Sequence, residues 1–390
     1  MADGGCRPVS RAVRFIRAAA ALAAALAASG CADFAELVDD ARAVARIGVI
    51  AHPEVEWPKS TERLQKALAY FRRRRVDAVV ILGELTKDGY MNQYRVLAQA
   101  WDKVFRDPVK GVDPHPPRRI CVLGGRERGN FVESYGDALE GTLFADGGEF
   151  DVGGFRFRAF CGRRPSSPPE ADGRVVPVFF SDGKPALTDE LCFYPRVSAA
   201  VRAGSLSGVA PRQGYEPVQS AGSASQGLVV TAYGDEAVVE RIDFVHAERV
   251  APDWRIPLRR ADVRKAPPDA APQFWADTRL KLTRGQSGQG PVYKLEWPPV
   301  LAKYTGVRAG SYEVEALLVR EDGRTAAIKR AYVLSPSFHL SEERDTAPVF
   351  CNFYASEFAE GSRVRFAVTP VSALGARGRP LVSEDVVIGR

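Results

Sequence analysis

The 390-residue chain has few of the residues that build the common metal and nucleophile motifs. It contains only six cysteines and four histidines. The cysteine spacings match no paired-cysteine zinc pattern. There is no Gly-x-Ser-x-Gly elbow, no Walker-type phosphate loop and no internal repeat. The net charge of +6 is too small an excess to indicate a nucleic-acid partner. The length and the 45% hydrophobic content instead indicate a folded protein of two domains.

The chain also lacks an apolar run long enough to span a bilayer comfortably. Its N-terminus combines several arginines, an alanine- and leucine-rich run over residues 18–28 and small residues that end at Cys31. These are the parts of a cleavable secretion signal, so residues 1–31 are predicted to be a signal peptide. Cys31 after Ser-Gly resembles a bacterial lipobox, with Ala28 where that motif prefers Leu. The protein is expected to cross the inner membrane and to be lipid-anchored to the cell envelope through Cys31, or to be periplasmic or extracellular if it is not lipidated.

The cysteines that would remain after cleavage leave their pairing open. An oxidising compartment permits a disulfide, but the sequence does not choose a pair among Cys121, Cys161, Cys192 and Cys351. Cys121 lies inside an apolar strand and is predicted to be a buried thiol.

The first domain, predicted over residues 44–260, has the pattern of an α/β protein. Buried strands are predicted at 46–51, 77–82 and 119–124, with helices at 60–75 and 93–105 between them. Such alternation implies βαβ units and a sheet covered on both faces. From about residue 149 the pattern changes to hairpins and short strands, so the domain begins parallel and ends antiparallel; these later strands are predicted at 155–160, 175–180, 227–233 and 237–242.

The C-terminal third has only strand-like alternation. A stretch rich in Pro, Ala and charge predicts a linker at 261–275, and short strands between turns predict a β-sandwich over 276–390. Residues 295–299, Leu-Glu-Trp-Pro-Pro, resemble the core-tryptophan strand of fibronectin type III domains, which places Trp297 in the core. Residues 366–372 and 375–378 resemble that domain's closing strands. His115 and His339 are expected to be exposed.

Polar residues follow the predicted strands of the first domain. Residues 50–54 are Ile-Ala-His-Pro-Glu, 82–86 Leu-Gly-Glu-Leu-Thr, 122–127 Val-Leu-Gly-Gly-Arg-Glu and 179–185 Phe-Phe-Ser-Asp-Gly-Lys-Pro. The carboxyl ends of strands in an α/β sheet are where its site usually lies. This order of segments resembles calcineurin-like metallophosphoesterases over residues 46–257. The resemblance implies a four-layer sandwich, in which helices flank two mixed sheets, followed by the all-β C-terminal sandwich.

In that family the motifs are Asp-x-His, Gly-Asp, Gly-Asn-His, a lone His and Gly-His-x-His, and they hold two metals that clamp a phosphate and activate a water. Here His52 has the Asp position of the first motif and Glu54 its His position. Glu84 replaces the bridging Asp, and Asp182 replaces the lone His. Carboxylates and imidazole remain legitimate ligands, so the resemblance implies candidate metal ligands at His52, Glu54, Glu84 and Asp182.

Two of the motifs are lost outright. Gly125 and Arg126 replace the Asn and the catalytic His of the third motif, and no histidine lies between His115 and His246, so Gly-His-x-His is absent. A guanidinium stays protonated and cannot coordinate a cation. These losses predict an envelope protein that works by binding or as a scaffold and not by catalysis, with no cofactor.

Two alternatives remain open. One is an active phosphoester hydrolase with a remodelled site for a divalent Mn, Fe or Zn ion. The other reads the same side chains as ordinary polar contacts, with Glu84 paired to Arg126. Arg126, Arg128 and Lys184 are candidate anion-binding residues that would replace the charge of the metals. The expected partners are an unknown envelope component or an anionic ligand, and the membrane through the lipid anchor; no nucleic acid is expected.

Overall fold

The computed structural model describes most of both predicted domains. No helix in the described ranges has the length and apolarity needed to cross a bilayer. The predicted signal peptide with Cys31 and residues 261–270 of the predicted linker lie outside these ranges. The structure describes residues 42–106, 115–124, 127, 143–144, 147–161, 176–181, 191–194, 198–202, 208–209, 212–213, 216–217, 222–223, 225–250, 252–258, 271–301, 306–339, 348–373 and 375–389.

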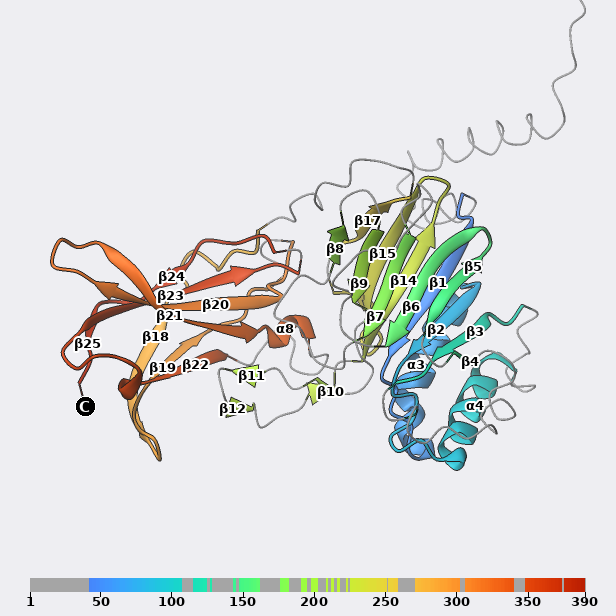
Figure 1. The fold of residues 1–390 in the computed structure, drawn as a ribbon, viewed down its shortest axis with the longest axis horizontal. Coiled ribbons are helices and arrows are strands. Elements are labelled where there is room, and N and C mark those ends of the chain that lie inside the picture. The colour runs from blue at the N-terminus through green and yellow to red at the C-terminus, as the bar shows by residue number, and fades with distance from the viewer. Residues whose placement is uncertain are drawn as a thin grey trace, which may run out of the picture. The chain divides into compact units, whose positions relative to one another are not determined.

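The first domain is built on an eight-stranded mixed sheet with a parallel centre. Its order is β16-β15-β14-β1-β2-β3-β4, and β17 also pairs with β15 (Figure 1). β1 to β4 pair in parallel, whereas β14 and β15 are antiparallel. The predicted parallel start and antiparallel end are therefore confirmed. The bounds are β1 Ala45–Ala51, β2 Ala78–Leu82, β3 Arg118–Val122, β4 Leu143–Phe144, β14 Gln226–Ala232, β15 Glu236–Asp243, β16 Glu248–Arg249 and β17 Trp254–Pro257.

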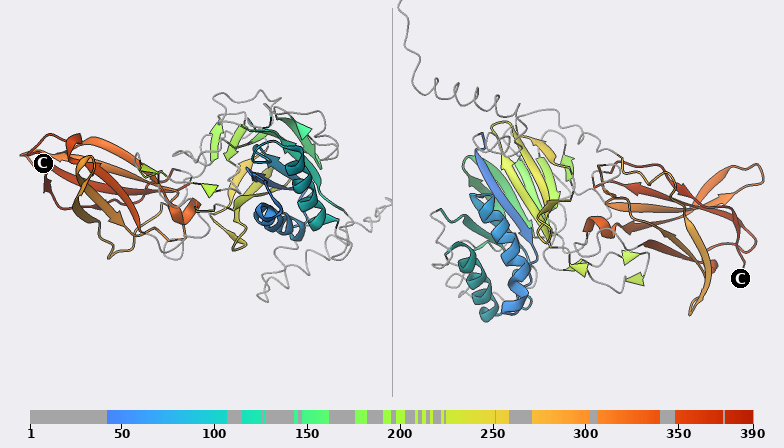
Figure 2. Two further views of the ribbon diagram at one scale, coloured as in Figure 1. Left: turned by 90° about the horizontal axis from the view of Figure 1, so that it is seen from below. Right: turned by 180° about the vertical axis from the view of Figure 1, so that it is seen from behind.

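Two helices cover one face of this sheet. α3 spans Glu62–Arg73 after the short η1 (Pro58–Thr61), and α4 spans Met91–Phe105. Both were predicted, and Figures 1 and 2 show them on the same side of the sheet. Their apolar stripes pack on residues such as Val79 and Ile81 in one core cluster. A side chain at Gly48 would meet the ring of Phe71 at 2.7 Å, so a glycine is needed for this close packing.

A second mixed sheet covers the opposite face. Its order is β5-β6-β7-β9-β8, and aromatic side chains from β5, β6 and β7 share a core cluster with β1 and β2. The stacking is helices, sheet, sheet, so the α/β sandwich is confirmed through three layers. A fourth, helical layer is not found among the described residues. The bounds are β5 Gly148–Val152, β6 Phe155–Cys161, β7 Val176–Ser181, β8 Leu191–Tyr194 and β9 Ser198–Arg202.

Four very short strands lie between β9 and β14. β10 and β13 pair with each other, and β11 pairs with β12 and with β21. Their bounds are β10 Gly208–Val209, β11 Arg212–Gln213, β12 Glu216–Pro217 and β13 Gly222–Ser223.

The C-terminal region is made of two antiparallel sheets that share one core. β18, β19 and β22 form a three-stranded sheet, and β20, β21, β23, β24 and β25 belong to a larger one. Trp297 is 1% exposed and lies edge-on to Tyr312 from the other sheet at 5.4 Å, as its predicted core position requires. The bounds are β18 Lys281–Ser287, β19 Gly290–Trp297, β20 Ser311–Val319, β21 Thr325–Leu334, α8 Pro336–His339, β22 Val349–Tyr354, η2 Ala355–Glu357, β23 Arg363–Val371, β24 Leu381–Val382 and β25 Val386–Val387.

The prediction that His339 is exposed is wrong. His339 is 4% exposed, and its Nε2 lies 3.0 Å from the backbone oxygen of Gly310. Its ring packs edge-on against Phe338 at 4.9 Å. A local turn between Leu334 and the helix α8 folds it inward, and no periodicity in four residues could signal this.

Buried thiols make the C-terminal core sensitive to alkaline pH. Burial, with a smaller contribution from Glu357, raises the pKa of the Cys351 thiol to about 12. The unfolded chain ionises this thiol first, near pH 8.5, so stability is complete below that pH and falls as the pH rises towards 12. We expect ionisation of the Cys351 thiol in the unfolded chain to lower the free energy of unfolding by about 2 kcal/mol at pH 10, relative to its value below pH 8.5.

The measurement is urea unfolding at pH 8 and pH 10 in a reducing buffer, for the wild type and for Cys351→Ala. Cys351→Ala should have a lower free energy of unfolding than the wild type at pH 8. Between pH 8 and pH 10, however, its free energy of unfolding should fall by less than that of the wild type. Val349→Ala is the matched control, since it removes buried apolar atoms from the same strand without removing a thiol. Equal pH dependence in Cys351→Ala and the wild type would contradict the prediction.

Candidate functional site

Three of the predicted metal ligands converge at the carboxyl ends of β1 and β2. One ligand atom from each of His52, Glu54 and Glu84 lies within 4.8 Å of the other two. His52 Nδ1 is 3.7 Å from Glu84 Oε2. His52 is 4% exposed and both carboxylates are partly buried. The structure thus brings these three strand-end residues together, and their role as metal ligands stays a prediction.

The backbone that carries these side chains has an unusual conformation. His52, Glu54 and Glu84 have φ values of +48°, +45° and +37°. Non-glycine residues rarely adopt this left-handed region, and each such residue costs on the order of 1 kcal/mol or more. Such strain persists where surrounding contacts over-determine the geometry, which is common at ligand sites.

Backbone hydrogen bonds supply those contacts. The amide of His52 donates to Leu82 O and the amide of Glu54 donates to Glu84 O, both at 3.0 Å. Val55 and Thr86 form a parallel bridge just beyond them. The two loops are therefore joined as a short continuation of the β1–β2 pair, and this continuation holds the three side chains together.

Two glycines allow the surrounding loops to approach. A Cβ atom at Gly83, whose φ is +50°, would lie 2.1 Å from Cys161 Sγ at the end of β6. A Cβ atom at Gly124 would lie 2.4 Å from the backbone nitrogen of Glu84. The β2 loop is therefore packed between the ends of β3 and β6 with no room for a side chain at either glycine.

Glu127 ties the second loop to the third. It is fully buried, and its Oε1 accepts from the amide of Thr86 at 3.1 Å while its Oε2 accepts from the amide of Gly124 at 2.8 Å. Burial raises the pKa of its carboxyl, although these backbone hydrogen bonds oppose the shift. Sequence reasoning missed this role. The only signal in the sequence was the position of this carboxylate, directly after Arg126 in the strand-end motif.

The remaining predicted site residues are not placed. Asp182, Arg126, Arg128 and Lys184 lie outside the described residues, so the fourth ligand and the anion-binding group stay predictions. Cys121 is buried, as predicted, and burial raises the pKa of its thiol to about 11. The thiols of Cys121 and Cys351 form no disulfide.

Known proteins resemble the chain only distantly. No protein-family profile matches it, and no curated protein matches it. No family is shown by sequence. Among solved structures, the chain is similar to a predicted phosphoesterase of Streptococcus pneumoniae, with 10% identity, a TM-score of 0.29 and coverage of 55% of this chain and 97% of that chain.

Two further solved structures are similar over the same part of the chain. Vacuolar protein sorting 29 of Cryptosporidium parvum has 11% identity, a TM-score of 0.31 and coverage of 55% of this chain and 98% of that chain. GAP50, the anchor in the inner membrane complex of Plasmodium, has 12% identity, a TM-score of 0.33 and coverage of 56% and 89%. These scores are too low to transfer the role of any residue.

The side chains fit one divalent ion better than two. Two ligands bound to one ion at about 2.1 Å lie at most about 4.2 Å apart. The 4.8 Å limit on His52, Glu54 and Glu84 is close to this value, so small side-chain rotations would bring all three onto one ion. A second ion needs further donors, and the described residues offer no other group of three or more such side chains. These three side chains by themselves supply ligands for one ion.

Proposed function

We propose that this protein is a cell-envelope protein in which a calcineurin-like phosphoesterase fold works by binding and not by hydrolysis. One observation carries the proposal: Gly125 and Arg126 stand where the family has its amide ligand and its catalytic imidazole, and the stretch between His115 and His246 has no histidine. The fold by itself implies no activity, so the site residues decide.

Electrostatics argue against a second metal beside Arg126. A guanidinium about 4 Å from a divalent ion is repelled by several kcal/mol at an intermediate dielectric constant. The same charge favours an anion, since guanidinium and ammonium groups form strong hydrogen bonds with carboxylate and phosphate oxygens. In this proposal Arg126, Arg128 and Lys184 bind an anionic group of the ligand at the edge of the sheet.

The other parts of the chain complete the proposal. Residues 1–31 direct export, and Cys31 carries the lipid that anchors the protein to the membrane. The C-terminal region serves as a fibronectin type III-like spacer or contact module. Its three-stranded sheet, the larger sheet that shares its core and the buried Trp297 support this assignment.

A second candidate function is a hydrolase with a single remodelled metal site. It is favoured by the convergence of His52, Glu54 and Glu84 within 4.8 Å. In that case the imidazole and the two carboxylates would hold one ion, which would supply Lewis-acid activation of a phosphoester.

Metal content and turnover together test the proposal. The chain from Ala32 to Arg390 is incubated with manganese, zinc and iron, desalted and analysed for bound metal, and hydrolysis of bis(p-nitrophenyl) phosphate is followed. We expect no turnover above background and at most one ion per chain. His52→Ala with Glu84→Ala should remove any bound ion, whereas Glu56→Gln, an acidic neighbour outside the cluster, should not.

The two candidates differ in turnover. Stoichiometric metal with turnover, both lost in the double variant and kept in Glu56→Gln, would establish the hydrolase and overturn the binding role. Metal without turnover would place a structural or ligand-binding ion in a non-catalytic site.

A further inference from the structure

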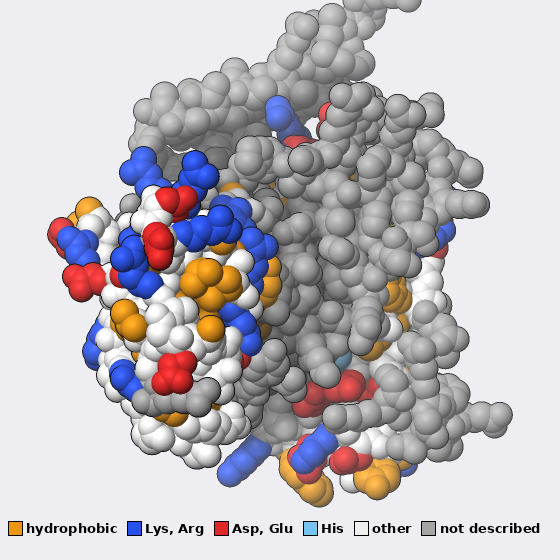
Figure 3. Space-filling model, turned by 60° about the vertical axis from the view of Figure 1, so that its left-hand side comes forward, with side chains coloured by type: hydrophobic (Ala, Val, Ile, Leu, Met, Phe, Trp, Pro, Cys, Tyr) orange, Lys and Arg blue, Asp and Glu red, His pale blue; other side chains and the backbone are white. Residues whose placement is uncertain are grey.

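A pocket on the C-terminal region belongs to none of the sites above. It has a volume of about 510 Å³ and lies where β19 ends, between residues 273–281 and residues 296–301. That volume is in the usual range for small-molecule ligand sites. Figure 3 shows one face of the C-terminal region, on which hydrophobic side chains lie among Lys and Arg side chains.

Several contacts hold the walls of the pocket in place. Phe274 stacks on the buried Tyr312 with ring centroids 6.0 Å apart and an interplanar angle of 19°. Pro298 and Pro299 have fixed φ angles. The backbone amide of Arg379 donates to Gln273 Oε1 at 3.1 Å, which attaches the outer segment to the domain. A ligand would therefore lose little affinity to ordering of the site.

Two tryptophans line the pocket. Trp275 lines it and is 58% exposed, which presents a large flat apolar surface to solvent. Trp297 also lines it, and its buried indole N–H has no hydrogen-bond partner in the described part of the chain. A buried donor without an acceptor costs about 1–3 kcal/mol. The exposed face of Trp275 beside the polar side chains of Gln273 and Thr278 favours a ligand with a flat apolar face and hydrogen-bonding groups.

The charge of the pocket is positive. Arg279 and Lys281 are the cations that line it and Glu296 is the anion, with Lys281 Nζ 3.3 Å from the Glu296 carboxylate. Arg279 donates to the backbone oxygens of Ala276 and Thr278, and no ion pair joins it to any carboxylate that the structure describes. A carboxylate on the ligand would complement this excess charge.

We propose that this pocket binds an acidic saccharide. The C–H face of one pyranose ring stacks on Trp275, the ring hydroxyls meet the polar lining, and the uronate carboxylate pairs with Arg279. A proline-rich peptide would also fit an aromatic and proline-lined groove, but it would leave the cations unused.

The test is isothermal titration of the chain from Ala32 to Arg390 with tetragalacturonate, maltotetraose and a proline decapeptide in 0.15 M NaCl. We expect saturable binding of tetragalacturonate that is at least tenfold tighter than that of maltotetraose. Trp275→Ala should weaken it at least tenfold, and Arg279→Gln should reduce the preference for the acidic sugar. Trp57→Ala is the matched control, since Trp57 is 60% exposed on the first domain.

Melting temperatures of all variants should stay within a few degrees of the wild type, because Trp275 and Trp57 are largely exposed. Absence of tetragalacturonate binding would overturn the proposal. So would equal affinity in the wild type and Trp275→Ala, which would mark non-specific attraction of an anion to a basic protein. Preferential binding of the decapeptide would assign the pocket to a peptide instead.

Discussion

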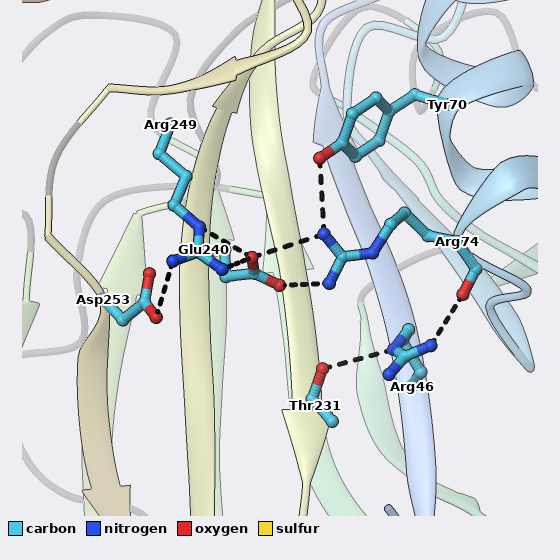
Figure 4. A network of polar contacts seen from close by, with 7 residues as sticks. All are labelled: Arg46, Tyr70, Arg74, Thr231, Glu240, Arg249 and Asp253. Carbon is cyan, nitrogen blue, oxygen red and sulfur yellow. Dashed lines mark hydrogen bonds and ion pairs between the residues drawn. The ribbon is translucent and has the colours of Figure 1, made fainter. Parts of the chain in front are cut away.

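Replacing Glu240 by alanine should lower the free energy of unfolding of the first domain by about 3 kcal/mol or more. Glu240 lies on β15 and is 3% exposed. Arg74 Nη2 donates to its Oε2 at 2.8 Å, and Arg249 Nη2 donates to its Oε1 at 2.6 Å (Figure 4). Without the carboxylate, two cations face each other. The Arg74 side chain is only 20% exposed, so water cannot fully replace the lost partner.

The network around Glu240 extends the effect of its removal. Arg46 on β1 donates to Thr231 Oγ1 at 3.3 Å and to the backbone oxygen of Arg74 at 2.9 Å (Figure 4). Arg74, which directly follows α3, is thereby bonded to β1 as well as to β15. The arginine side chains lie over β14 and β15, and their apolar stems shield the sheet. We therefore expect the end of α3 to loosen together with β15.

A matched control lies on the same strand. Glu236 pairs with Arg255 at 2.6 Å, but its side chain is 37% exposed and that of Arg255 is 60% exposed. Glu236→Ala should therefore cost less than about 1 kcal/mol. Urea unfolding gives the total loss, and hydrogen exchange of the β14 and β15 amides reports this domain alone. Similar losses for the two variants would show that the buried network contributes no more than a surface pair.

The centre of the fold could be predicted because its strands are buried on both faces. Every residue of β1 and β2 is buried, so β2 appears in the sequence as an unbroken apolar run of strand length, and so does β1 after Arg46. The helix α3 between them was recognisable from the 3.6-residue spacing of Leu64, Leu68 and Phe71. Apolar runs and helical spacing are both visible within a short stretch of sequence. These elements could therefore be predicted from local sequence alone.

The site could be predicted only in part, because some of its features depend on contacts between segments that lie far apart in the sequence. His52, Glu54 and Glu84 were found because each follows an apolar strand. Neither their left-handed backbone nor the bridge between the two loops can be recognised from composition or periodicity. Glu127 bonds to an amide 41 positions earlier in the chain, a contact that only the folded sheet creates.

Replacing Glu127 by alanine should release the loops that carry the site and destabilise the domain by about 2–5 kcal/mol. The buried amides of Thr86 and Gly124 would both lose their acceptor, and each unsatisfied buried donor costs about 1–3 kcal/mol. Glu127→Gln keeps the size of the side chain and one acceptor oxygen, but turns an NH₂ group towards the other amide. It should therefore destabilise nearly as much as alanine does.

Hydrogen exchange separates this clamp from a general loss of packing. In Glu127→Ala the amides of Thr86 and Gly124 should exchange much faster, while amides in the middle of β1 and β2 change only as global stability changes. Glu56→Gln removes an exposed ion pair with Lys87, 2.7 Å long, from the same two loops and should cost less than about 1 kcal/mol.

Because the amide of Glu54 donates to the backbone oxygen of Glu84, loosening of the β2 loop should also spread His52, Glu54 and Glu84 apart. Any metal bound there should weaken in Glu127→Ala and not in Glu56→Gln. Protected Thr86 and Gly124 amides in Glu127→Ala would mean that the carboxylate does not hold these loops.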